Sequence, residues 1–187
     1  VSSLENLAKL SVVLDEVVDE LKLDAISIRC WMELEKVFKI APCILLSDLN
    51  NRGIPAACEL DVGNGIMMAA LAAVSGGAAT CLDWNNNYGG DPDKCILFHC
   101  GPVPSSLMKS KGELVEHYMF AKSLGCGCGW GPNQGRIASF PMTFASAKTE
   151  NGKIFAYLGE GEITDDEIPR EYFGCAGVAK IGNLQKK

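Results

Sequence analysis

The sequence lacks a surplus of positive charge, a basic leader followed by an apolar run, and internal repeats. Its 23 acidic residues outnumber its 17 basic residues, and the net charge of −6 argues against nucleic acid or an anionic membrane as the main partner. The first 24 residues are acidic and amphipathic, which is not the pattern of a secretory signal peptide. These absences favour a cytoplasmic protein with a small, neutral or polar partner.

The CxxC spacing of zinc ribbons and thioredoxin-like motifs is also missing, although the chain has nine cysteines. The number is odd and most of them lie in apolar runs, so we expect buried, reduced thiols. Cys126 and Cys128 lie close together in the glycine-rich segment GCGCGWG. A redox or metal-storage module would use this pair, but no nearby Lys or His is present to lower the pKa of either thiol.

Periodicity predicts an α/β fold in which helices dominate the first part of the chain. The composition, 48% hydrophobic and 21% charged, is that of a globular protein. Apolar spacing and cap residues predict helices at 3–22, 41–53 and 62–74, and short buried strands at 24–30 and 54–59. After Gly76 and Gly77 the pattern changes to a mainly β region, with strands expected at 78–84, 95–101, 135–149 and 153–163 and one helix at 112–124.

Two carboxylates and one imidazole are expected at the ends of successive strands. Glu59 ends the strand at 54–59, Asp83 lies at the end of the next one, and His99 ends the one after that. Ligands of α/β sheets bind beyond the carboxyl ends of the strands, so these groups can converge on one divalent ion. Oxygen-rich ligation suits Mn²⁺ or Mg²⁺ better than structural zinc.

Each of these residues also has an ordinary structural alternative. Glu59 can be a salt-bridged acid, Asp83 can cap a loop, and Asp61 is better explained as the cap of the helix at 62–74. His99 can be an interior histidine bonded to a backbone carbonyl. His117 is expected to be solvated or part of the packing of the helix at 112–124.

Four short motifs make the chain resemble the L-fucose isomerase and L-arabinose isomerase superfamily of metal-dependent ketol isomerases. The motifs are ACELD with Glu59, CLDWNNNY with Asp83, FHCG with His99, and the hairpin FPMTFASAKTENGKIFAYLGEGEI. The resemblance covers most of the chain from about residue 25. It implies the end of a parallel-sheet α/β/α domain (1–76) followed by a mainly antiparallel, β-barrel-like C-terminal domain (77–187).

The resemblance also implies a site. Glu59 and Asp83 match the two metal-binding carboxylates of the family and would act as acid and base in interconverting an aldose and a ketose through a cis-enediol. Mn²⁺ or another divalent cation would be the cofactor and a deoxy sugar or pentose the substrate. His99 lies where the arabinose type has a histidine ligand, and Trp84 and Tyr88 are expected, with His99, to contact the sugar, although packing explains the two aromatic side chains equally well.

The last metal ligand of the family is a histidine close to the C-terminus, and no histidine follows residue 117 here. We therefore expect the chain to be the C-terminal part of a longer protein, inactive by itself and homo-oligomeric when complete. The alternative is a non-catalytic sugar-binding or regulatory relative that has kept the fold.

Overall fold

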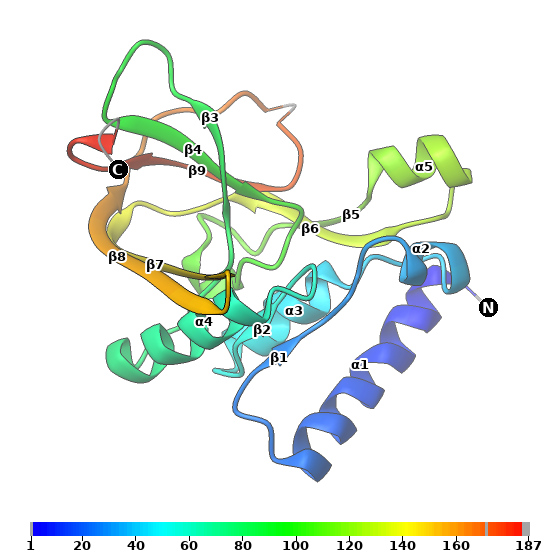
Figure 1. Ribbon diagram of the computed structural model, residues 1–187. Helices are drawn as coiled ribbons and strands as arrows, with labels where there is room; N and C mark the ends of the chain where they lie inside the picture. Colours follow the sequence, from blue (N-terminus) through cyan, green and yellow to red (C-terminus); the bar gives the residue numbers. More distant parts are fainter. Residues whose placement is uncertain (1, 171, 185–187) are drawn as a thin grey trace.

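Two hydrophobic cores organise residues 2–170 and 172–184, which are the residues described by the computed structural model. Helices gather around the first core, and a sheet carries the second (Figure 1). The buried members of the first core lie between residues 14 and 58, and those of the second between residues 95 and 181. The predicted domain division near residue 76 falls between these two sets, and it stays a prediction.

The helical part contains a small parallel sheet. Its elements are α1 (Ser3–Leu21), β1 (Ile26–Ser27), α2 (Glu33–Val37), α3 (Cys43–Asn51), β2 (Ala56–Ala57) and α4 (Val62–Ser75). Helix α1 begins with a capping box in which Ser2 and Glu5 satisfy each other's backbone amides, and Ser2 is one of the two serines that the sequence offers as its N-cap. Strands β1 and β2 pair in parallel over two residues each, so the parallel sheet is shorter than the predicted strands.

The buried side chain of Asn50, near the end of α3, fixes the position of β2. Its amide oxygen accepts from the backbone N–H of Ala56 at 2.7 Å, and its amide nitrogen donates to the carbonyls of Ala56 at 3.2 Å and Pro102 at 3.0 Å. A buried amide with these three hydrogen bonds ties the two parts of the chain together. These hydrogen bonds also fix the backbone of β2, the strand that precedes Glu59.

Helix α4 has the predicted bounds and cap but not the burial that its apolar sequence suggests. Asp61 accepts from the backbone N–H of Asn64, which confirms its role as the helix cap. A Cβ added at Gly63 would lie 2.7 Å from the carbonyl oxygen of Ala147, so the helix backbone approaches β7 closely. On the remaining surface of the helix the apolar side chains of Val62, Ile66 and Val74 are exposed.

The sheet has seven strands and is mainly antiparallel. Its strands are β3 (Asp83–Asn87), β4 (Lys94–His99), β5 (Glu113–Glu116), β6 (Trp130–Arg136), β7 (Phe140–Glu150), β8 (Lys153–Ile163) and β9 (Cys175–Lys180). The order is β3-β4-β9-β6-β5, and the predicted β7–β8 hairpin is attached to β9 through β8. The remaining elements are η1 (Ser105–Leu107) and α5 (Tyr118–Leu124).

The expected barrel is not formed by the described residues. Strand β8 pairs with β9 only at Glu162 and Ile163, and β6 pairs with β9 over two residues in parallel. The hairpin curves back toward α4 (Figure 1), and among the described residues it does not pair with β3 to close the sheet. No helix of the described chain is long and apolar enough to cross a membrane.

Two predicted elements differ from the observed ones. The strand predicted at 78–84 begins only at Asp83, so this carboxylate opens β3 instead of ending a strand. The first part of the helix predicted at 112–124 is β5, which pairs with β6, and helix α5 starts at Tyr118. Pairing with a neighbouring strand outweighs local propensity in both places.

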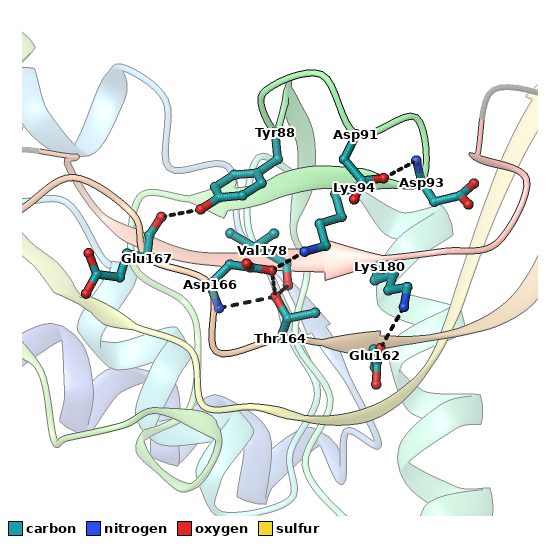
Figure 2. A network of polar contacts seen from close by, with 10 residues as sticks. All are labelled: Tyr88, Asp91, Asp93, Lys94, Glu162, Thr164, Asp166, Glu167, Val178 and Lys180. Atoms are coloured by element: carbon teal, nitrogen blue, oxygen red, sulfur yellow. Dashed lines mark hydrogen bonds and ion pairs between the residues drawn. The ribbon is translucent and has the colours of Figure 1, made fainter.

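A polar network fastens the segment after β8 to the sheet (Figure 2). The ammonium of Lys94 lies 2.7 Å from the carboxylate of Asp166, which also accepts from the hydroxyl of Thr164. Hydrogen bonding to Lys94 and to Thr164 lowers the pKa of Asp166. The hydroxyl of Tyr88 donates to the carbonyl of Glu167 at 3.0 Å, which connects the β3–β4 turn to the same segment.

Candidate functional site

Glu59 occupies a strained backbone position just beyond β2. Glu59 and Leu60 have φ values of 59° and 57°, in the left-handed region that non-glycine residues rarely adopt. The conformation is held by hydrogen bonds from the N–H of Leu60 to the carbonyl of Ile28 (3.0 Å) and from the N–H of Asp61 to the carbonyl of Cys58 (3.1 Å). Two adjacent left-handed residues are costly, and such strain is concentrated at functional sites.

His99 ends β4, as predicted, and is buried beside both carboxylates. It is 3% exposed, and its Nδ1 accepts from the backbone N–H of Cys100 at 2.9 Å. Burial lowers the pKa of His99 despite the opposing charges of Asp83 and Glu59, so the ring is neutral at physiological pH. Since Nδ1 accepts, the single ring proton lies on Nε2, which makes His99 a hydrogen-bond donor at that atom and not a metal ligand.

The charges of Glu59 and Asp83 converge on one set of buried groups. Asp83 pairs across the sheet with Phe98, the neighbour of His99. Both carboxylates act on the pKa of His99, and both also help burial to raise the pKa values of Cys81 and Cys100 to about 12. The two acids, which the sequence separates by 24 residues, therefore act on the same buried groups, and the raised pKa values keep both thiols protonated.

The carboxylates themselves are exposed and have no ion-pair partner in the described part of the chain. Two free carboxylates are hard oxygen donors that fit part of the coordination shell of Mn²⁺ or Mg²⁺. Within residues 2–170 and 172–184 no three His, Cys, Asp or Glu side chains are placed to hold a metal ion. The donor set here thus accounts for two ligands of such an ion.

The structure gives packing contacts to both aromatic residues predicted to contact the sugar. Trp84 lies edge-on to Phe144, with ring centroids 5.6 Å apart. Tyr88 uses its hydroxyl to hold Glu167, and the ammonium of Lys94 lies 5.9 Å from its ring centre (Figure 2). The role of Trp84 and Tyr88 toward a ligand stays a prediction.

A cavity of about 620 Å³ adjoins the site without containing it. Among the described residues, Asp83 and Trp84 line it, together with apolar side chains of α4 and β7, whereas Glu59 and His99 do not. Polar side chains of α4 and β7, among them Asn64 and Thr143, also line this cavity. It therefore offers polar groups beside Asp83, but it does not bring Asp83 together with Glu59 and His99.

His117 is 1% exposed, so of its two expected roles the packed one is confirmed and the solvated one is wrong. Its Nε2 lies 3.4 Å from the thiol of Cys100, and its ring packs on Phe120 and Phe173 with centroids 4.4 and 4.7 Å away. Cys100 and Phe173 are distant in sequence, so no local pattern could have revealed this environment. All nine cysteines are free, as predicted.

Burial of His117 predicts a pH-dependent stability. Burial lowers the pKa of His117 to about 4 from an ordinary value of 6.5. As the pH falls, the unfolded chain protonates His117 near pH 6.5, before the folded chain does. The stabilising effect of the neutral ring is therefore complete above about pH 6.5 and is lost as the pH falls toward 4. We expect urea unfolding of the His117→Phe variant, followed by circular dichroism between pH 7 and pH 4, to show a smaller loss of stability than the wild type. An unchanged pH dependence in the variant would contradict this account.

Comparison with known proteins supports the resemblance found in the motifs. Residues 97–187 match the family model described as the L-fucose isomerase C-terminal domain. The chain is 24% identical over 136 residues to the sulfoquinovose isomerase of Priestia aryabhattai, covering 73% of this chain and 30% of that protein. It is 24% identical over 184 residues to the sulfoquinovose isomerase of Alkalicoccus urumqiensis, covering 98% of this chain and 40% of that protein.

These matches show that residues 97–187 are similar to the C-terminal domain of L-fucose isomerase, and they support a fucose isomerase-like C-terminal fragment. The chain spans 30 to 40% of the length of these curated relatives. Glu59 and Asp83 lie outside the segment that the family model covers.

Proposed function

We propose that the complete protein is a metal-dependent isomerase that interconverts an aldose and a ketose, with its reactive centre at Glu59 and Asp83. The observation that carries the proposal is the convergence of two exposed, unpaired carboxylates on a buried, neutral imidazole. The similarity to proteins named sulfoquinovose isomerase supports the same class of reaction. A deoxy sugar or pentose remains the proposed substrate class.

Glu59 and Asp83 would hold the divalent ion, Mn²⁺ in this proposal, and the ion would supply polarisation of the sugar carbonyl. One carboxylate takes the proton from carbon 2 while the other, as a carboxylic acid, protonates the carbonyl oxygen to give the cis-enediol. Return of the first proton to carbon 1 and loss of the carbon-2 hydroxyl proton to the second carboxylate then give the ketose. The Nε2–H of His99 donates to the oxygen on which negative charge develops. Burial keeps His99 neutral, so that it can donate without exchanging its own proton.

The transfer of deuterium from solvent tests this proposal. The complete protein is incubated with L-fucose, L-arabinose and sulfoquinovose in D₂O with MnCl₂, and proton NMR follows the hydrogen on carbon 2. We expect one sugar to form a ketose that carries deuterium at carbon 1, to exchange the hydrogen at carbon 2 of the remaining aldose by the reverse reaction, and to stop reacting when EDTA is added. Ketose formation in which the hydrogen from carbon 2 is transferred completely to carbon 1, at every reaction time, would contradict the enediol, because direct hydride transfer retains that hydrogen.

A sugar-binding protein without turnover is the second candidate, and one observation favours it. The described residues bring together two potential metal ligands and not three. Binding of a sugar with neither ketose formation nor deuterium exchange, in the presence of Mn²⁺, would support this candidate over the enzyme.

A further inference from the structure

A layer of aromatic rings packs together on elements that the proposed reaction does not use. The ring of Trp31 lies 5.1 Å from Phe120, and Tyr118 lies 5.2 Å from Phe173, both edge-on. The imidazole of His117 contacts all four rings at centroid distances from 4.4 to 6.2 Å. We call these five side chains the aromatic platform. In Figure 1 its segments, the β1–α2 connection and the β5–α5 region, lie on the same side of the molecule.

The platform has a buried layer and an exposed layer. His117 and Phe120 are 1% and 4% exposed, whereas Trp31 and Tyr118 are 44% and 58% exposed. Neither exposed ring has a hydrogen bond from its polar atom within the described residues. Rings held from below by edge-on contacts keep their orientation, so their outer faces are preorganised for a ligand.

Two cysteines connect the platform to the proposed reactive centre. Trp31 follows Cys30, whose thiol lies 2.9 Å from the thiol of Cys58 and against the backbone amide of Glu59. On the other side, Nε2 of His117 lies 3.4 Å from the thiol of Cys100, the residue that follows His99. The platform is therefore connected to Glu59 through Cys30 and to His99 through Cys100.

The chemistry of the two parts is complementary in the way that a sugar requires. The centre offers carboxylates and one N–H donor for hydroxyl and carbonyl oxygens, and the platform offers flat apolar faces for the carbon–hydrogen side of the same molecule. Trp84 and Tyr88, the aromatic residues expected from the sequence to do this, have packing partners of their own.

We propose that Trp31 and Tyr118 form the stacking surface for the sugar whose carbonyl end lies at Glu59 and Asp83. This inference rests on the proposed function, because it takes its ligand from it. The two side chains position the substrate and take no part in proton transfer. Replacing either ring by Ala should weaken binding without slowing the chemical step.

Binding is tested first with hexitols, which are reduced sugars that cannot isomerise. The complete protein is titrated with L-fucitol, a deoxyhexitol that matches the proposed substrate class, and with D-glucitol and galactitol in the presence of Mn²⁺, and binding is followed by calorimetry and tryptophan fluorescence. We expect Trp31→Ala and Tyr118→Ala each to raise the Kd of the hexitol that binds by roughly tenfold. Trp31→Phe should retain most of the affinity and lose most of the fluorescence change. Phe155→Ala is the matched control, because Phe155 is also an exposed ring (47%) but lies in β8, outside the aromatic platform.

Measurements of KM and kcat distinguish the stacking proposal from the proposed function. With a reacting sugar, KM should rise about tenfold in Trp31→Ala and Tyr118→Ala while kcat changes less than about twofold. Unchanged Kd and KM in both variants of an active enzyme would overturn the stacking surface and leave the isomerase in place. Hexitol binding that depends on Trp31, in a protein that isomerises nothing, would retain the surface and reject the isomerase. Failure of every hexitol to bind would overturn the stacking surface.

Discussion

Replacing Glu59 by Gln is expected to lower kcat for isomerisation by about 10³-fold while leaving the fold intact. Gln has nearly the same size but neither a negative charge nor basicity, so it can neither hold the cation nor accept the proton. Glu59 is exposed and has no ion pair within the described residues, so the change leaves no buried charge without a partner. The measurement is the rate of ketose formation at saturating Mn²⁺, with circular dichroism as the check on folding.

The control for this variant is Glu20→Gln, which removes an exposed carboxylate from α1, away from the site. It should retain the wild-type rate. Turnover of Glu59→Gln within a few-fold of the wild type would remove Glu59 from the reactive centre.

Replacing Gly131 by Ala is expected to destabilise the protein by about 3 kcal/mol or more. A Cβ at this position would lie 1.6 Å from the carbonyl oxygen of Ala41, and the backbone has φ 144°. The N–H of Ala41 donates to the carbonyl of Trp130 at 2.9 Å, so β6 and the start of α3 are in direct backbone contact here. The added methyl group would have to push the helical part away from the sheet.

Urea denaturation followed by circular dichroism measures this effect, and Gly90→Ala is the matched control. A Cβ at Gly90 meets no atom within 4 Å, and its φ is not in the left-handed region. Its unfolding midpoint should stay close to that of the wild type. A loss below about 1 kcal/mol in Gly131→Ala would show that the contact between α3 and β6 yields easily.

The sequence predicts the local elements that have strong cap and turn signals. Helix α1 with its Ser2 cap, α4 with its Asp61 cap and the β7–β8 hairpin all appear where the patterns place them. In each case the deciding interactions are between residues close in sequence. Composition and cysteine placement likewise predict reduced thiols, which the structure confirms.

The errors concern segments whose structure depends on distant partners. Residues 84–87, which are mostly polar, form a strand because they pair with β4. The apolar residues before Asp83 line a cavity instead of pairing. Leu114 has helical spacing, yet it pairs with Asn133 in β6. The apolar composition of α4 suggests a buried helix. Gly63 does bring one side of the helix close to β7, but other apolar side chains of the helix remain exposed.

The same distinction between local and distant contacts applies to the candidate site. The sequence proposes Glu59, Asp83 and His99 as site residues from the family motifs and from expected strand ends, and the strand end expected at Asp83 is wrong. It does not predict the left-handed backbone at Glu59, the direction of the hydrogen bond to Nδ1 of His99, or the burial of His117. These features come from contacts between β1, β4, α5 and the segment before β9.

The central claim is that Glu59 and Asp83 bind one divalent ion, and Mn²⁺ binding tests it most directly. Calorimetric titration with MnCl₂ is carried out on the wild-type protein and on Glu59→Gln, Asp83→Asn and Glu20→Gln. The account predicts one Mn²⁺ per wild-type chain, the same affinity in Glu20→Gln, and an affinity at least about tenfold lower in each of the two site variants. Equal affinity in all four proteins, or no binding to the wild type, would contradict it.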